Sequence, residues 1–186
     1  MTRFGYSCLA VLSVLTTAGV SYAQHHHHGS EPPLPKEAVA VLVPMSGSHV
    51  TGTVLLAQEG KAVHVTGTIR GLTPGLHGFH IHAFGDLRDP KGMSVGGHYD
   101  HNGHKHGGPE SHEHHAGDLG NVKAGQDGTA KVNVHVPNLK LHFIVGRSLV
   151  VHADPDDLKS QPSGNSGARV GVGVIGLAEV KAPATR

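Results

Sequence analysis

Short runs in which apolar and polar residues alternate, separated by glycine-rich turns, constrain the fold of this chain more than any other feature. Alternation places apolar side chains on one face of a β-strand, and it begins at Ala38. Turn residues recur at intervals of about 8 to 12 residues, and no segment shows a long helical period. The sequence therefore predicts an all-β domain, an antiparallel sandwich or barrel, with eight strands at residues 38–43, 50–56, 62–69, 75–84, 119–124, 129–136, 143–151 and 170–180. Gly52 and Gly67 interrupt two of these strands, and we expect β-bulges there.

The first 23 residues have the pattern of a cleaved signal peptide. Arg3 precedes a short apolar run at 8–15, and the small residues Ser21 and Ala23 flank Tyr22 before the expected cut after Ala23. The alternative is a membrane anchor, but the apolar run is short for a bilayer. We therefore expect export to the periplasm or secretion, with no membrane attachment after cleavage.

Residues 24–37 form a linker that is rich in His and Pro, and we expect it to be disordered. It contains His25–His28, which is either a remnant of a purification tag or, as we favour, a native metal-catching tail. The expected domain covers residues 38–181, and 182–186 form a short tail.

Charge and cysteine content narrow the choice of partners. Removal of residues 1–23 takes away only Arg3 among the charged residues, so the 15 basic side chains become 14 and balance the 14 acidic ones. This balance argues against nucleic acid or a membrane surface as the main partner. Cys8 is the only cysteine, so the mature chain has no disulfide. The 19 histidines, by contrast, indicate metal binding.

Histidines at two spacings supply candidate ligands. His80 and His82 lie two residues apart on an expected strand, so both imidazoles point to the same face. The long loop from Gly85 to about Asp118 then adds three imidazoles and one carboxylate, a set that suits tetrahedral zinc. These loop residues are His98, His106, His115 and Asp118, and His152 at the end of another expected strand completes the candidates.

Longer motifs around these ligands resemble the copper/zinc superoxide dismutase family. The motifs are residues 71–86 (GLTPGLHGFHIHAFGD), 105–109 (KHGGP), 115–121 (HAGDLGN), 146–152 (GRSLVVH), 164–169 (GNSGAR) and 173–176 (GVIG). The resemblance covers roughly residues 38–181 and includes ligands, spacers and glycines together. It implies an eight-stranded antiparallel Greek-key barrel with long metal-binding and channel loops.

The resemblance also assigns roles to individual residues. The copper ligands would be His80, His82, His98 and His152, and the zinc ligands would be His98, His106, His115 and Asp118. His98 would then bridge the two metals as an imidazolate and supply a proton during turnover. Asp156 would be the outer carboxylate that joins His80 to His106, and Arg169 would stand at the mouth of the copper channel.

The function implied is dismutation of superoxide, a small anion, to oxygen and hydrogen peroxide by alternate reduction and oxidation of copper. Zinc would hold the loop and tune the bridge. Two alternatives are a non-enzymatic copper-binding or copper-delivery domain on the same fold and a zinc-only structural module. Because no apolar patch marks an edge strand, the sequence favours a monomer over a homodimer.

The sequence departs from the family at its usual internal disulfide, where Gly92 and Val172 occupy the matching positions. Stability would then depend on the metals, and we expect Arg169 to be held less firmly. The histidines of the long loop have two interpretations, transient copper capture or a solvated polar loop, and we favour the second for His101, His104, His112 and His114. His49, His64 and His135 are interpreted as exposed strand residues, and His77 and His142 as hydrogen-bonded structural histidines.

Overall fold

A computed structural model describes residues 33–179. Eight strands form its framework, and each apolar run found in the sequence lies in or beside one of them. The strands are β1 (Glu37–Pro44), β2 (Thr51–Glu59), β3 (Ala62–Arg70), β4 (Gly75–His82), β5 (Asp118–Ala124), β6 (Ala130–Pro137), β7 (Ser148–His152) and β8 (Arg169–Leu177). The expected signal peptide at 1–23, most of the linker and the tail at 182–186 lie outside the described residues.

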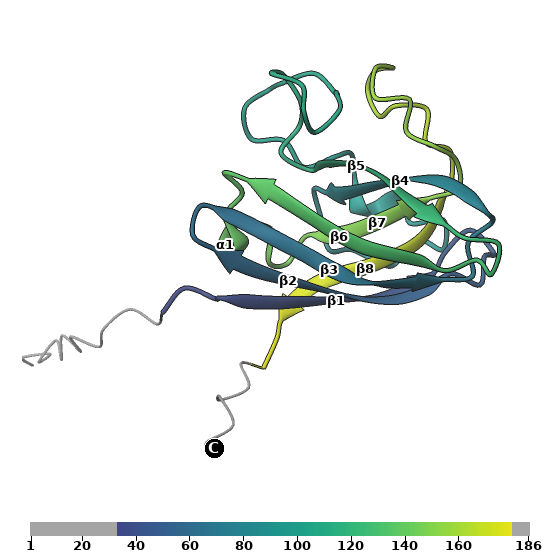
Figure 1. The fold of residues 1–186 in the computed structure, drawn as a ribbon, viewed down its shortest axis with the longest axis horizontal. Helices are drawn as coiled ribbons and strands as arrows, with labels where there is room; N and C mark the ends of the chain where they lie inside the picture. The colour runs from purple at the N-terminus through teal and green to yellow at the C-terminus, as the bar shows by residue number, and fades with distance from the viewer. Residues whose placement is uncertain (1–32, 180–186) are drawn as a thin grey trace, which may run out of the picture. The chain divides into compact units, whose positions relative to one another are not determined.

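The strands close into one antiparallel barrel in the order β1-β2-β3-β6-β5-β4-β7-β8 (Figure 1). The chain leaves β3 for β4, which is not its neighbour, and returns through β5 to place β6 beside β3. This exchange of neighbours is the Greek-key connection, and closure leaves every strand paired on both sides. The predicted all-β Greek-key barrel is confirmed.

Alternating apolar side chains fill the interior of the barrel. Ala38, Ala40 and Leu42 of β1 are buried, and between them the side chain of Val41 is exposed. The same pattern recurs in β2 and β3, so inward-facing residues of all the strands meet in one core. A second, smaller group of buried apolar residues lies outside this core and consists of Met45, Val95, Val150 and Val172.

Two local expectations were wrong. The apolar run at 143–151 is not one strand, because a single helical turn, α1 (Leu141–Ile144), precedes β7. Gly52 and Gly67 do not mark bulges, since the pairing of β2 with β3 is regular throughout. Instead, a Cβ on Gly52 would lie 2.7 Å from the Thr68 carbonyl oxygen of the neighbouring strand. Both glycines are therefore explained by a close approach of two strands.

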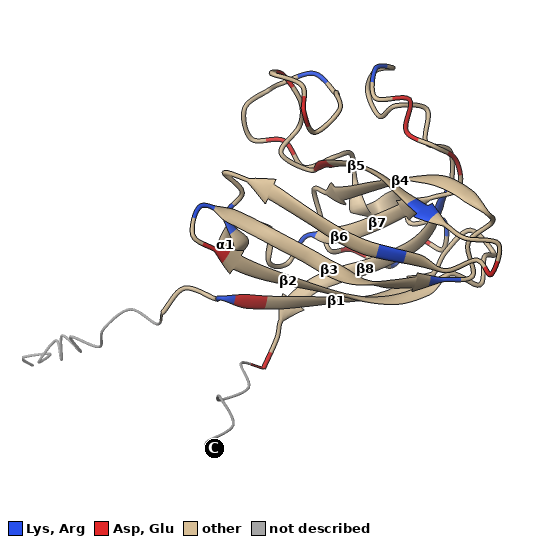
Figure 2. Cartoon of the chain, in the orientation of Figure 1, with Lys and Arg blue, Asp and Glu red and all other residues tan. Residues whose placement is uncertain are grey.

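Two long loops lie on the same side of the barrel and frame the candidate site (Figure 1). The first joins β4 to β5 and includes a short 3₁₀ turn, η1 (Met93–Val95), while the second joins β7 to β8. Figure 2 shows charges of both signs on these loops and few on the strands. Between residues 33 and 179, no helix has the length and apolar character needed to cross a membrane.

Candidate metal centre

Strand β4 delivers two histidines from one face. His80 and His82 are buried at 0% and 1% exposure, and their ring centroids are 6.3 Å apart. Ile81 between them points the other way and belongs to the barrel core. Both imidazoles therefore point to the same face of β4, as their i, i+2 spacing predicts, and the packing of Ile81 in the core fixes that direction.

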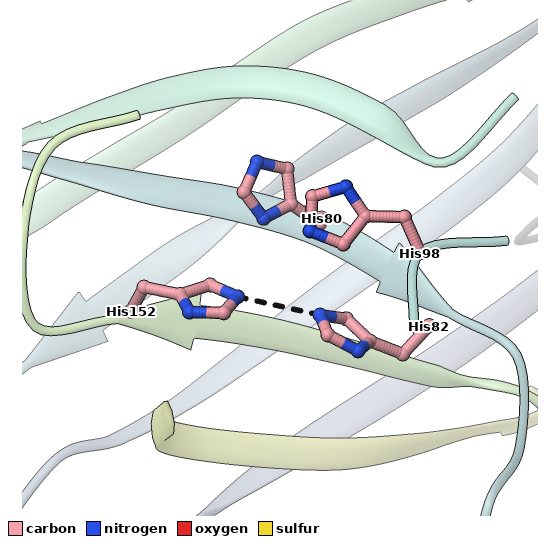
Figure 3. A group of neighbouring side chains, drawn as sticks. All are labelled: His80, His82, His98 and His152. Atoms are coloured by element: carbon pink, nitrogen blue, oxygen red, sulfur yellow. Dashed lines mark hydrogen bonds between the residues drawn. The ribbon is translucent and has the colours of Figure 1, made fainter. Parts of the chain in front are cut away.

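His98 from the first long loop and His152 from the end of β7 join this pair (Figure 3). The ring of His98 stacks on that of His80, with centroids 3.9 Å apart. Each of the four residues offers a ring nitrogen within 4.8 Å of the others. We call His80, His82, His98 and His152 the four-histidine cluster.

Backbone carbonyls decide which nitrogens of His82 and His152 face inward. His82 Nδ1 lies 2.9 Å from the Gly96 carbonyl oxygen, and His152 Nδ1 lies 3.3 Å from that of Gly167. Since a carbonyl can only accept, each Nδ1 carries the proton and each Nε2 keeps a lone pair. The two Nε2 atoms are 3.3 Å apart (Figure 3), a separation suited to two ligands of one metal ion.

A second cluster forms around one oxygen of Asp118. The Nδ1 atoms of His98, His106 and His115 lie 2.7, 3.1 and 3.3 Å from Asp118 Oδ1. Three imidazole nitrogens and one carboxylate oxygen at these separations are the donor set of a closed tetrahedral zinc site. We call His98, His106, His115 and Asp118 the carboxylate cluster.

The main chain holds Asp118 in place for this role. Its Oδ2 accepts hydrogen bonds from the backbone N–H groups of Gly107 and His115, at 3.1 and 2.8 Å, which leaves Oδ1 to face the three rings. Burial acts to raise the pKa of Asp118, but the hydrogen bond and charge of His98 hold that pKa well below its ordinary value. The carboxylate is therefore ionised and ready to bind a cation.

His98 belongs to both clusters. Its Nδ1 faces Asp118, while its Nε2 is buried and has no hydrogen-bond partner. His80 Nδ1 and His106 Nδ1 are likewise buried without a partner. Buried polar atoms are rarely left unpaired, because an unmet donor or acceptor costs about 1–3 kcal/mol. Three such nitrogens in two adjoining clusters fit sites built for cations.

Asp156 joins the clusters from outside, as expected. Its Oδ2 lies 2.8 Å from His80 Nε2, and its Oδ1 lies 3.0 Å from His106 Nε2. A carboxylate that accepts from both Nε2–H groups leaves both Nδ1 atoms with lone pairs. These two Nδ1 atoms are among the three unpartnered nitrogens. The orientation of the Asp156 carboxylate therefore leaves one nitrogen lone pair free to bind a metal in each cluster.

Three residues that support this arrangement were not singled out from the sequence. Asn121 exchanges hydrogen bonds with the backbone of Asp156, at 2.8 and 2.9 Å, and Gln161 does the same with the backbone of His106, at 2.9 Å. Gly164 has φ +66, and a Cβ there would overlap Asp156 Oδ1. Asn121 and Gly164 lie inside the family-like motifs, which is the only signal that marks them; Gln161 lies outside every motif.

Burial keeps three histidines of the four-histidine cluster neutral, namely His80, His82 and His152. Loss of solvent, together with the neighbouring imidazoles, lowers the pKa of His80 and of His82 well below the ordinary value. Burial also lowers the pKa of His152 to about 4. Neutral imidazole is the form that binds metal, so these rings are ready ligands near neutral pH.

A cavity of about 520 Å³ opens onto both clusters and has a cationic rim. It reaches His82, His98, His115 and His152, and the charged side chains that line it are Lys91 and Arg169, with no carboxylate. Arg169, expected at the mouth of a copper channel, thus lines a cavity that also reaches His82, His98 and His152. Lys91 was not foreseen, because nothing in the sequence distinguishes it from other polar loop residues.

Arg169 is firmly anchored, contrary to the expectation drawn from the missing disulfide. Its Nη1 donates to the Gly92 carbonyl oxygen, and its Nη2 donates to that of Gly96 at 2.6 Å. Gly92 also packs on Val172, since a Cβ on Gly92 would lie 3.2 Å from Val172 Cγ2. The loop at 92–96 is thus held by Arg169 and by the small apolar group around Val95 and Val172.

Five other histidines are of two kinds. His77 is buried and contacts the carbonyl oxygens of His152 and Thr73 at 2.9 and 2.8 Å, which confirms its structural role. The extra histidines of the first long loop line a separate cavity of about 240 Å³; they are His101, His104, His112 and His114. Within residues 33–179, none of these four belongs to a group with metal-binding geometry.

Comparison with known proteins agrees with this geometry. The family model described as copper/zinc superoxide dismutase (SODC) matches residues 50–175, more than half of the chain. A solved structure described as a crystal structure analysis of the clock protein EA4 is 36% identical, with a TM-score of 0.73. The match covers 82% of this chain and 99% of the other. The chain belongs to the copper/zinc superoxide dismutase family.

Proposed function

We propose that this protein is an exported superoxide dismutase that converts superoxide to oxygen and hydrogen peroxide. One observation carries the proposal: His98 presents Nδ1 to a carboxylate cluster suited to zinc and a buried, unpartnered Nε2 to a four-histidine cluster suited to copper. A carrier or a purely structural module does not need one ring shared between two unlike donor sets.

The donor sets fit the two metals of the family. Copper would be held by His80 Nδ1 and by the Nε2 atoms of His82, His98 and His152. Zinc would be held by Asp118 and by the Nδ1 atoms of His98, His106 and His115. When bound, copper supplies the one-electron chemistry that oxidises one superoxide to oxygen and reduces a second one to peroxide.

The residues around the cavity select and position the substrate. Lys91 and Arg169 make the rim cationic, and this attracts a small anion. Arg169 is fixed by two carbonyl oxygens, so its charge stays aimed at the cavity without reorganisation. His98 is the residue proposed to move a proton, because it lines the cavity and its Nδ1 is oriented by Asp118.

The activity is tested with purified chain loaded with one copper and one zinc. We expect it to remove superoxide far faster than the same amount of free copper, and rates equal to free copper would reject the proposal. Arg169→Ala distinguishes an enzyme from a copper-delivery domain. An enzyme loses turnover and salt dependence, whereas a carrier still transfers copper to a chelator at the original rate. Lys123→Ala, on β5, is a matched control that removes a cation elsewhere.

Export is proposed from residues 1–23 alone. Expression of the full chain in a bacterium should give a mature protein that begins at Gln24 in the periplasmic fraction. N-terminal sequencing checks the cut, and an intact Met1 on protein that stays in the cytoplasm would contradict it. The mass of that mature protein in solution also tests the predicted monomer.

A further inference from the structure

A second group of possible metal ligands lies on the outer surface of the barrel. His64 of β3 and His135 of β6 are directly opposite each other, and Glu59 at the end of β2 is close to both. Buried Val63 and Val65 flank His64, so both histidines face away from the core. The ligand atoms of the three residues all lie within 4.8 Å of one another.

We propose that Glu59, His64 and His135 form an additional binding site for a divalent transition-metal ion such as Zn²⁺. His64 Nδ1 is 3.3 Å from Glu59 Oε1, and His135 Nδ1 is 3.9 Å from Glu59 Oε2. Two ligands of a tetrahedral zinc ion are separated by about 3.3 Å, given bond lengths near ~2.0–2.1 Å. The first distance already matches, and the second is longer by about 0.6 Å, a difference that a turn of the exposed His135 side chain can close.

The neighbours of His64 leave room for Glu59 and set the orientation of the imidazole. Ala57, directly opposite His64 on β2, is small, so the Glu59 side chain can reach back over it. On the other side, the Asn133 Oδ1 atom lies 2.7 Å from His64 Nε2. Because that oxygen can only accept, Nε2 carries the proton of the neutral ring and Nδ1 keeps its lone pair towards Glu59.

The lone pair of the neutral His64 ring and the Glu59 carboxylate oxygen repel each other at 3.3 Å, and either a proton on Nδ1 or a metal cation between the two atoms relieves that repulsion. The ring of His135 stacks on that of His64, with centroids 3.9 Å apart and planes 10° apart, so a second imidazole can bind the same ion once its ring turns to point Nδ1 at it. An outer acceptor that orients a ligand histidine is a regular feature of metal sites. With three protein ligands at the surface, a fourth coordination position remains open to water or to a ligand.

The test uses the full chain loaded with copper and zinc, with His25–His28 replaced by alanine in every variant so that this tail cannot bind metal. Equilibrium dialysis against Zn²⁺ followed by elemental analysis should show one additional zinc per chain. His64→Ala and His135→Ala should each raise the half-saturating Zn²⁺ concentration by at least about tenfold, or about 1.4 kcal/mol. His49→Ala, an exposed histidine outside the clusters in residues 33–179, should leave it unchanged.

Asn133 provides a test of the positioning argument. Asn133→Asp keeps an acceptor beside His64 and should retain the additional zinc, while Asn133→Leu should weaken binding by about tenfold. Copper content of one per chain shows that each variant is folded. A crystal of the unmodified chain soaked in Zn²⁺ should show an anomalous peak between Glu59 and the two histidines. No additional zinc, or additional zinc that survives both His substitutions, overturns the proposal.

Discussion

Replacing Asp156 with asparagine should weaken copper binding and spare zinc binding. The two carboxylate oxygens of Asp156 are not equivalent. Oδ1 accepts from His106 Nε2–H at 3.0 Å and from the backbone N–H of Leu158 at 2.7 Å, whereas Oδ2 lies 2.8 Å from His80 Nε2. A backbone N–H cannot turn away, so the asparagine oxygen takes the Oδ1 position and its NH₂ group faces His80.

Two donors then face each other at His80. The ring either keeps its Nε2 proton beside the NH₂ group or moves that proton to Nδ1, where it blocks the atom proposed to bind copper. An unmet buried donor costs about 1–3 kcal/mol, which corresponds to about a 5-fold to 150-fold loss of copper affinity. His106 keeps its acceptor, so zinc affinity should change little.

Competition with a chelator, followed by elemental analysis, measures both affinities on the same sample. Asp156→Ala removes both acceptors and should weaken both metals, while Asp127→Asn makes the same change of charge on the exposed β5–β6 turn and should affect neither. If Asp156→Asn weakened zinc more than copper, or left copper affinity unchanged, the reasoning from the two oxygens would be refuted.

Three further perturbations test other parts of the structure. Gly164→Ala places a Cβ against Asp156 Oδ1 at a residue with φ +66, so both metals should be lost more easily to a chelator; unchanged retention would contradict this. The metal-free chain should lose at least about 2 kcal/mol of stability between pH 7 and pH 4.5. Unfolding raises the pKa of His152 from about 4 to 6.5, so the unfolded state binds a proton that the folded state excludes, and the lowered pKa values of His80 and His82 act in the same direction. Urea unfolding at both pH values checks this, and equal stability would disprove it. Val95→Ala, at a fully buried position of the small apolar group, should cost about 2 kcal/mol in the same assay, and a loss below measurement error would show that this group does not hold the loop.

Alternation revealed the strands because each has one face in the barrel core. It failed at the start of 143–151, because Phe143 and Ile144 belong to a helical turn that begins at Leu141 and buries Leu141 and Ile144. Gln58 Oε1 accepts the Leu141 N–H at 2.8 Å, so a side chain from β2 stabilises the start of that turn. A short apolar run has no period that separates helix from strand, and a contact across 83 positions leaves no local trace.

The family resemblance allowed the candidate ligands and their grouping into two sets to be inferred from the sequence, but local pattern alone does not bring them together. Only His80 and His82 are related by a local period; the others are brought together by loops whose shape depends on contacts such as Gly107 N–H with Asp118. The anchoring of Arg169 by Gly92 and Gly96 depends on two left-handed glycines in a loop without a pattern. The pairing of His64 with His135 likewise depends on the register of β3 with β6, which alternation does not define.

The shared position of His98 is tested most directly by diffraction from the chain loaded with copper and zinc, with data collected at the absorption edges of both metals. We predict two separate peaks, copper beside His98 Nε2 with His80, His82 and His152, and zinc beside His98 Nδ1 with the carboxylate cluster. Both peaks on one side of His98, or a His98 ring that contacts neither metal in the fully loaded protein, would contradict the proposed function.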